Sequence, residues 1–224
     1  MTEREIVRLE PGFVLHMRPY KNTSQLLDCL TENHGVITLI AQGSRRSRSD
    51  RRVVLQPFSL LQLSWIRRGE LGRLTQAEAV SSTLALSGEE VLAGFYLNEL
   101  LLRLMGREDP NPLVFSCYSR CLSDLSGLSN TPRAVRLFEL RLLQALGYGI
   151  ELQEDAETGK AINSESFYEF KPEHGFTLRN TPDKGPYIFK GCELISLREE
   201  CLNDRQSLKA AKRLLDLVLR VYLG

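Results

Sequence analysis

The first 80 residues alternate between short apolar runs and turn residues. Apolar and polar side chains interleave from Phe13 to Arg18, and a β-branched run extends from Val36 to Ile40. The pattern predicts strands at 13–18, 26–30, 36–40, 53–63 and 71–77. Pro57 suggests an edge, a bulge or a strand start within the fourth strand. Five short strands without an intervening helix are typical of a small β-barrel such as the OB-fold.

From about residue 85 the apolar positions recur with a helical period. Residues 91–105 are apolar nearly all round, which predicts a central buried helix, and a second helix carries its apolar side chains between Val114 and Leu125. Thr131 followed by Pro132 predicts a helix that threonine caps, with Gly147 as its left-handed stop. Further helices are expected at 193–201 and 208–222.

Between Gly149 and Gly191 the helical pattern fails, and only a hairpin is expected, from Phe167 to Phe170 and from Phe176 to Leu178. The predicted fold class is therefore α+β. A five-stranded OB-fold barrel at residues 1–80 precedes a mostly α-helical domain at residues 81–224, which contains a small hairpin near 165–180. A chain of 224 residues is long enough for two such domains.

Charge is segregated between the two predicted domains, although the formal net charge is only +1. Residues 1–80 contain 12 Lys and Arg against 8 Asp and Glu, a net charge of +4; residues 81–224 contain 17 against 20, a net charge of −3. A basic module joined to a mildly acidic one suggests that the first binds an anion and the second has another task.

The stretch 43–52 contains five arginines and one aspartate. Guanidinium groups on a barrel rim can each fork onto phosphate oxygens, which favours a nucleic-acid backbone as ligand. The alternative is a loop that is simply well solvated. Tyr20, Phe58 and Trp65 could stack on unpaired bases or belong to the core. The candidate DNA-binding residues are Arg45, Arg46, Arg48, Arg51 and Arg52, together with Arg18 and Lys21.

Nothing in the sequence supports catalysis. Residues 43–49 lack the second glycine and the lysine of a phosphate-binding loop, and the three histidines lie near no nucleophile motif. Five cysteines form no Cys-x-x-Cys pair, so we expect reduced thiols and neither a metal nor a cofactor. The charged residues from Met1 to Pro11 have no apolar stretch behind them, so no secretory signal is expected. No run approaches the roughly 18 apolar residues of a membrane span, and both observations favour a cytoplasmic protein.

Arg136 combines charge with neighbouring apolar surface on the helix that begins near Pro132. Arg133 and Leu140 are three and four residues away and share its face. Such a site could bind a peptide that ends in an aromatic residue and a free carboxylate. The alternative is a solvated helix face.

Over nearly the whole chain, a series of segments in order resembles the bacterial recombination mediators of the RecO family. No single segment is decisive, but their order and spacing make the match specific. The segments are Gly12-Phe13-Val14-Leu15-His16, Arg18-Pro19, Ala41-Gln42-Gly43-Ser44-Arg45, Leu55-Gln56-Pro57-Phe58, Glu78-Ala79-Val80, Tyr96-Leu97-Asn98-Glu99-Leu100-Leu101, Thr131-Pro132, Arg136-Leu137-Phe138-Glu139-Leu140, Leu146-Gly147-Tyr148-Gly149 and Ala210-Ala211-Lys212-Arg213.

This resemblance implies a non-enzymatic protein of DNA repair in the RecF pathway, associated with the nucleoid. It would bind single- and double-stranded DNA, anneal complementary strands coated by single-stranded-DNA-binding protein, and load the recombinase with RecR. RecF and the RecA recombinase would be indirect partners. The arginines after Gly43 correspond to the family's basic DNA-contacting loop. Arg136 falls where a helical-domain arginine meets the terminal carboxylate of the binding protein's acidic tail.

The chain departs from many RecO proteins in one respect. Those relatives carry a four-cysteine zinc element in the region between Gly149 and Gly191, whereas this chain has no cysteine there before Cys192. The resemblance is therefore to the zinc-free type. The alternatives that the residues leave open are a non-catalytic OB-fold adaptor and an OB-fold RNA-binding protein.

Overall fold

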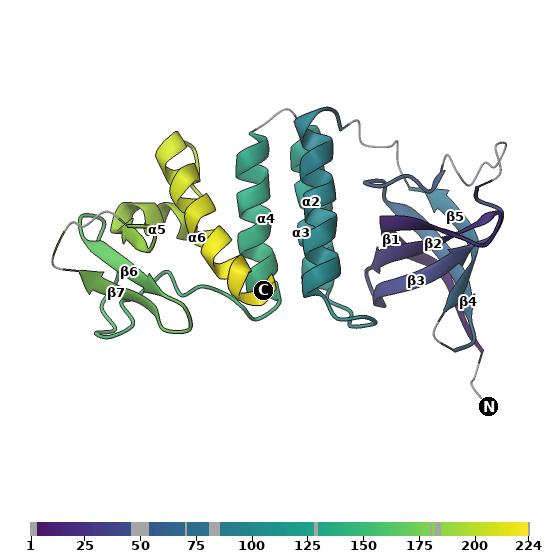
Figure 1. The fold of residues 1–224 in the computed structure, drawn as a ribbon, viewed down its shortest axis with the longest axis horizontal. Coiled ribbons are helices and arrows are strands. Elements are labelled where there is room, and N and C mark those ends of the chain that lie inside the picture. The colour runs from purple at the N-terminus through teal and green to yellow at the C-terminus, as the bar shows by residue number, and fades with distance from the viewer. Residues whose placement is uncertain are drawn as a thin grey trace. The chain divides into compact units, whose positions relative to one another are not determined.

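A computed structural model describes residues 4–45, 54–69, 71–80, 86–127, 130–179, 181 and 185–223 (Figure 1). Its contacts divide the chain into two compact units, Met1–Ser129 and Asn130–Gly224. In the described residues, the first unit contains a barrel followed by helices, and the second contains helices and a small sheet. No helix in the described part of the chain is both long and apolar enough to cross a membrane.

Five strands form a closed barrel in the order β1-β2-β3-β5-β4, which confirms the predicted α+β fold with an N-terminal OB-fold barrel. All neighbouring pairs are antiparallel except β3 and β5, which run parallel. The strands are β1 (Glu5–Tyr20), β2 (Ser24–Thr31), β3 (Gly35–Ala41), β4 (Leu61–Arg67) and β5 (Gly72–Ala79).

Strand β1 closes the barrel because it is long enough to pair on both sides. Its first half pairs with β4, from Glu5 opposite Arg67, and its second half pairs with β2, up to Tyr20 opposite Ser24. The ladder with β4 is irregular between Val7 and Glu10, where Leu9 has a φ of 52°. The strand begins eight residues before Phe13, its predicted start; the charged residues before Phe13 show no strand pattern.

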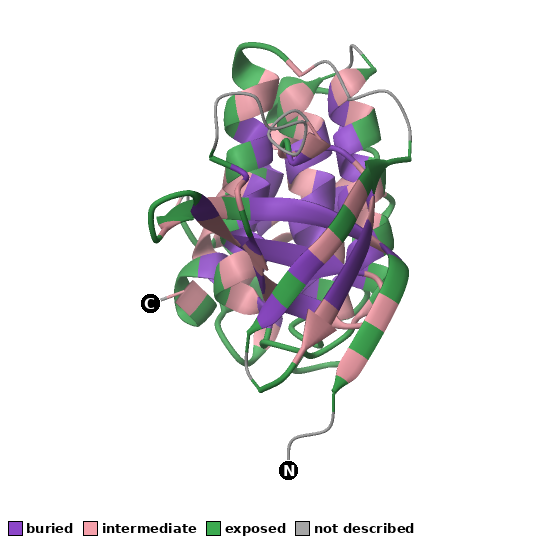
Figure 2. Cartoon of the chain, turned by 90° about the vertical axis from the view of Figure 1, so that its right-hand side faces the viewer, coloured by how far each residue is buried: buried purple, intermediate pink, exposed green. Residues whose placement is uncertain are grey.

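The barrel interior is filled by apolar side chains that alternate with outward-facing residues along the strands (Figure 2). Its core includes Val14, Leu27, Leu39, Leu63 and Trp65, all at most 2% exposed. Phe13 and Leu15 are buried as well, and the Phe13 ring contacts Phe115 and Tyr118, at centroid distances of 5.4 and 5.1 Å. This part of β1 is therefore covered on both faces, which explains why its burial does not alternate.

The predicted strand at 53–63 is wrong over most of its length. Residues 54–60 form no strand, and β4 begins only at Leu61. Pro57 has no N–H to donate to a ladder, and Phe58 has a φ of 66°. This segment instead places Phe58 against Phe95, with ring centroids 5.1 Å apart.

The first unit also contains the helices α2 (Glu89–Leu104) and α3 (Pro112–Ser126). The apolar positions predicted for α3, from Val114 to Leu125, are buried. The all-round burial predicted for α2 is wrong, because Leu92 is 71% and Phe95 49% exposed. Only the face that carries Leu97 and Leu101 is fully covered.

The second unit begins with α4 (Thr131–Ala145), whose cap was misassigned. The side chain of Asn130, not Thr131, accepts a hydrogen bond from the backbone N–H of Arg133. Pro132 lies in the first turn, and Gly147 has the left-handed φ of 81° that its predicted role as a stop requires. The remaining elements are β6 (Phe167–Lys171), β7 (Gly175–Arg179), β8 (Ile188–Lys190), α5 (Gly191–Arg198) and α6 (Arg205–Leu223).

Strands β6 and β7 form the predicted hairpin, and β8 adds to it in the order β7-β6-β8. Helix α6 packs against both α4 and α5 (Figure 1). One face of α6 is buried, with Ala211, Leu215 and Val218 at most 5% exposed. Its opposite face is polar.

Candidate nucleic-acid interface

Arg45 follows β3 directly and is fixed by a short turn. Gly43 has a φ of 71°, and the buried hydroxyl of Ser44 donates to the carbonyl oxygen of Ala41 at 3.0 Å. The backbone N–H of Arg45 donates to the carbonyl oxygen of Thr23 at 3.1 Å, and its guanidinium Nη1 donates to that of Lys21 at 3.3 Å. The turn between β1 and β2 is therefore bonded to the first residues after β3.

Lys21 and Arg18 belong to the same end of the barrel. Lys21 opens the β1–β2 turn, where it has a φ of 49°, and its Nζ lies 5.3 Å from the centroid of the Tyr20 ring. Arg18 is exposed and pairs with Leu26 of β2. Of the seven cations predicted to bind DNA, Arg18, Lys21 and Arg45 are thus brought to one rim. The other four, Arg46, Arg48, Arg51 and Arg52, lie outside the described residues.

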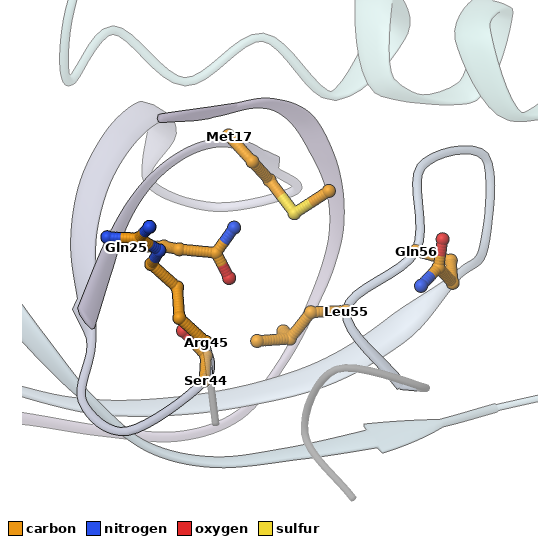
Figure 3. A pocket seen from close by; sticks show the side chains of 6 residues that line it. All are labelled: Met17, Gln25, Ser44, Arg45, Leu55 and Gln56. Atoms are coloured by element: carbon orange, nitrogen blue, oxygen red, sulfur yellow. The ribbon is translucent and has the colours of Figure 1, made fainter. Parts of the chain in front are cut away.

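A hollow of about 480 Å³ lies beside Arg45 (Figure 3). The side chains of Met17, Gln25 and Leu55 point toward it, while Gln56 lies at its margin. The described residues of its lining therefore combine a cation, amide groups and apolar surface. Such a mixture can bind a phosphate and cover the edge of a sugar or a base.

Two of the three aromatic candidates for base stacking are core residues. Trp65 is 2% exposed inside the barrel, and Phe58 is 7% exposed against Phe95. Neither ring can be reached by a base. Tyr20, partly exposed beneath Lys21, is the candidate that the structure leaves accessible.

The register identifies cations that sequence reasoning did not single out. Arg73 pairs with Ile40 of β3, and both side chains point outward. Ile40 pairs with Leu26, which pairs with Arg18, so a row of outward side chains crosses the sheet with a cation at each end. The signal for Arg73 was the alternation of exposed and buried positions along β5.

Beside Arg73, a second hollow of about 380 Å³ is lined by Arg4, Arg68 and the apolar Ile66 and Leu71. Within the described ranges, these arginines show no ion pair within 4 Å. The barrel surface therefore carries positive charge beyond the predicted loop.

The predicted tail-binding residues Arg133, Arg136 and Leu140 all lie on α4. Arg136 is 12% exposed, and its Nη1 lies 2.8 Å from Glu139 Oε2 and 3.5 Å from Asp216 Oδ1. Arg133 Nη2 donates to the carbonyl oxygen of Glu200 at 3.1 Å. Leu140 is 1% exposed, so the prediction that it forms apolar surface beside Arg136 is corrected.

None of the five cysteines, all of them in the described part of the chain, forms a disulfide, and burial raises the pKa of the Cys29 thiol far above its usual range, with a smaller contribution from the charge of Asp28. Across the described residues, no group of three or more His, Cys, Asp or Glu side chains is arranged to bind a metal. The expectation that the chain needs no metal stays a prediction.

Comparison with known proteins gives two family models that together cover most of the chain. "Recombination protein O N terminal" matches residues 7–83, and "Recombination protein O C terminal" matches residues 86–224. The two models meet between 83 and 86, whereas the compact units divide after Ser129, because α2 and α3 pack with the barrel.

Curated relatives named "DNA repair protein RecO" align with almost the entire sequence. The protein of Haemophilus influenzae is 40% identical over 216 residues, which is 96% of this chain and 91% of the relative. The protein of Glaesserella parasuis is 39% identical over 220 residues, which is 98% of this chain and 91% of the relative. The protein of Serratia proteamaculans is 42% identical over 216 residues, which is 96% of this chain and 88% of the relative. The chain therefore belongs to the RecO family, with a role in DNA repair and recombination.

Proposed function

We propose that this protein binds single- and double-stranded DNA through the rim of its barrel. The observation that carries the proposal is the bonding of Arg45 to Thr23 and Lys21, because it gathers cations from two separate loops at one place. Charge-assisted hydrogen bonds from such cations to phosphate oxygens would supply affinity without reading sequence.

The protein acts by binding, without making or breaking a covalent bond. Cations on the rim reduce the repulsion between two phosphate backbones, so that complementary strands coated by single-stranded-DNA-binding protein can meet and anneal. The barrel at residues 1–80 is the DNA-binding module in this scheme, and residues 81–224 form the domain that docks partners. Both would act in the cytoplasm, at the nucleoid.

The acidic tail of single-stranded-DNA-binding protein is the proposed ligand of Arg133 and Arg136. A terminal carboxylate would replace Asp216, which lies 3.5 Å from Arg136. If the protein binds single-stranded-DNA-binding protein through this site while its rim binds DNA, each binding event raises the effective concentration of the other ligand. RecR would then convert the complex into a loader of the RecA recombinase, with RecF acting indirectly.

Fluorescence anisotropy tests the proposal directly. Labelled single-stranded DNA, duplex DNA and RNA of equal length are titrated with the protein at two salt concentrations. We expect both DNA forms to bind, with an affinity that falls steeply as salt rises, because each neutralised phosphate releases counterions. Binding of RNA alone would favour the RNA-binding alternative, and absence of binding to all three would favour the adaptor.

A further inference from the structure

The exposed face of α6 is strongly and unevenly charged. Its 19 residues contain five cations and a single acid, Asp216. Residues 130–224 as a whole contain 14 Lys and Arg against 14 Asp and Glu, so the excess is local to this helix. We call the cations the α6 basic face; they are Arg205, Lys209, Lys212, Arg213 and Arg220, at successive spacings of four, three, one and seven residues along the helix.

Two of the five cations, Lys212 and Arg213, lie near an acid in the described part of the chain, and the other three do not. Asp216 lies in contact with Lys212 and is also 3.5 Å from Arg136. Among the described residues, Arg205, Lys209 and Arg220 have no ion pair within 4 Å, and all three are exposed. A helix face that is merely solvated usually alternates the sign of its charges, which pair at a spacing of four residues. The α6 basic face does not.

Part of this face lines a hollow of about 460 Å³. Arg213 is fixed at its wall, because its Nη2 donates to the carbonyl oxygen of Ile188 at 2.8 Å and its guanidinium lies 4.2 Å from the centroid of the Phe189 ring. Arg205 and Lys209 lie along the same hollow. The arrangement offers one immobilised cation and two adaptable ones to an anion.

The acid of the hollow, Glu193, is already engaged. Its Oε2 accepts from the backbone N–H of Lys190 at 3.1 Å, and its Oε1 accepts from Gln206 Nε2 at 3.3 Å. Arg213 Nη2 is 3.6 Å from the same carboxylate. Glu193 therefore offsets part of the charge of Arg213, while Arg205 and Lys209 have no acid within 4 Å among the described residues.

We propose that the α6 basic face is a second contact for a nucleic-acid backbone, separate from the barrel rim. From Arg205 to Arg220 the helix rises about 22 Å, comparable to about six base pairs of duplex. An acidic peptide with an apolar anchor fits less well, because Ala210 is the one apolar residue among the described residues of the lining, and an anchoring side chain would bury little against it. This inference rests on the proposed DNA binding and adds a site to it.

A second contact on the other compact unit changes how the protein would hold DNA. Two weak sites joined by one chain bind a long strand more tightly than either does alone, because the second contact becomes intramolecular. The contribution of α6 should therefore increase with the length of the DNA. It should also be lost at high salt, as for any phosphate contact.

The test compares Arg205→Ala/Lys209→Ala with a control that removes two cations elsewhere in the same unit. The control is Lys171→Ala/Arg179→Ala, in the β6–β7 hairpin, where each cation lies within 4 Å of a glutamate. Binding of labelled duplex DNA is measured by anisotropy from 50 to 200 mM salt. We expect the slope of log affinity against log salt to become shallower by about 1.8 for the α6 variant and to stay unchanged for the control.

Between 50 and 200 mM salt, the parent should lose affinity for duplex DNA by a factor about ten times larger than the factor by which the α6 variant loses it. A slope equal to that of the parent, or the same change in the control, would overturn the inference. Circular dichroism verifies folding, and Arg205→Gln/Lys209→Gln replaces the alanine variant if that variant unfolds.

Lys21→Ala/Arg45→Ala, measured in parallel, separates this inference from the proposed function. If the slope of log affinity against log salt becomes shallower for the rim variant but not for the α6 variant, the proposed rim site is supported and the proposed α6 site is wrong. If the parent binds no DNA at all, the proposed function fails first, and the inference fails with it.

Discussion

The side-chain amide of Asn98 donates a hydrogen bond to the backbone carbonyl oxygen of Leu15, 83 residues earlier in the chain, at 2.8 Å. The same amide group accepts from the hydroxyl of Tyr118 at 2.5 Å. Asn98 is 2% exposed, and burial raises the pKa of the Tyr118 hydroxyl well above its usual range, so the hydroxyl stays a donor. One buried amide thus ties α2 to both α3 and β1.

Replacing Asn98 with leucine should destabilise the first unit. The change removes the donor to the Leu15 carbonyl and the acceptor of the Tyr118 hydroxyl, at a cost of about 1–3 kcal/mol for each buried group. We expect the free energy of unfolding in urea to fall by about 2–4 kcal/mol. Glu99→Gln, at an exposed position on the same helix, is the control and should change it little. Equal stability of the two variants would contradict this role.

Asp28 should make stability depend on pH at the acid end. Burial by itself raises its pKa, but hydrogen bonds from Thr38 and Arg107 and the charges of Arg107 and Arg18 outweigh it, so the pKa lies below its ordinary value. A depressed pKa stabilises the fold above the unfolded-state value of about 3.9, and this stabilisation disappears as pH falls through the folded-state pKa.

Asp28→Asn should therefore lower stability at pH 7 and flatten the loss of stability below about pH 4. Urea unfolding at a series of pH values measures both effects. Asp109→Asn, at an exposed carboxylate, serves as the control. If the free energy of unfolding of Asp28→Asn falls below pH 4 as steeply as that of the parent, Asp28 is not the source of the acid dependence.

Removal of the rim cations should weaken DNA binding without changing the fold. Lys21→Ala/Arg45→Ala is expected to reduce the salt slope for duplex DNA by about 1.8, and Arg18→Ala to reduce it by a further 0.9 or so. Arg103→Ala/Arg120→Ala, at exposed positions on α2 and α3, removes the same charge from helices of the same unit. The rim assignment would be wrong if both double variants changed the slope equally.

Arg136 and Asp216 should have opposite effects on tail binding. Arg136→Ala should abolish binding of a fluorescent acidic peptide with a free carboxylate and leave DNA affinity nearly unchanged. Asp216→Asn should strengthen peptide binding about fivefold, as expected for removal of a competing charge worth about 1 kcal/mol. Glu157→Gln controls for net charge. Peptide affinity that survives Arg136→Ala would remove this residue from the site.

A close contact between Gly94 and Phe58 should make the helix intolerant of a methyl group. A Cβ atom at Gly94 would lie 2.6 Å from Cε1 of Phe58. Gly94→Ala should destabilise the first unit by about 1–3 kcal/mol, and Phe58→Leu in the same chain should restore part of this loss. Gly149→Ala, where the nearest atom would be 3.6 Å away, is the comparison. Additive effects of the two substitutions would contradict direct contact.

Local sequence signals predicted most elements, because turn residues and apolar periods act over a few residues. They failed where tertiary contacts decide the backbone. Glu5 to Arg8 look like a charged tail, yet they form strand because β4 offers them a free edge on which the barrel closes. Phe58 leaves the strand pattern because Gly94 of α2 gives its ring a place to pack.

The candidate site was predicted in part. The cluster of arginines after Gly43 is visible in the sequence, but the hydrogen bond from Arg45 to Lys21 joins residues 24 apart, and no local pattern shows it. The α6 basic face did have a sequence signal, namely cations at helical spacing. Leu140 was assigned to a surface because the period of α4 shows which residues share a face and does not show which face is covered.

By itself, the sequence determined the order of strands and helices, the segregation of charge and the RecO resemblance, because each depends on residue types at short spacing. Only the tertiary structure decided which cations lie together. Arg18, Lys21 and Arg45 lie at one rim because β1 and β3 end there, and Arg136, already beside Glu139 of its own helix, gains a second acid neighbour because α6 packs on α4 and brings Asp216 to it. Such meetings depend on contacts between distant residues, which the pairing of strands and the packing of helices create.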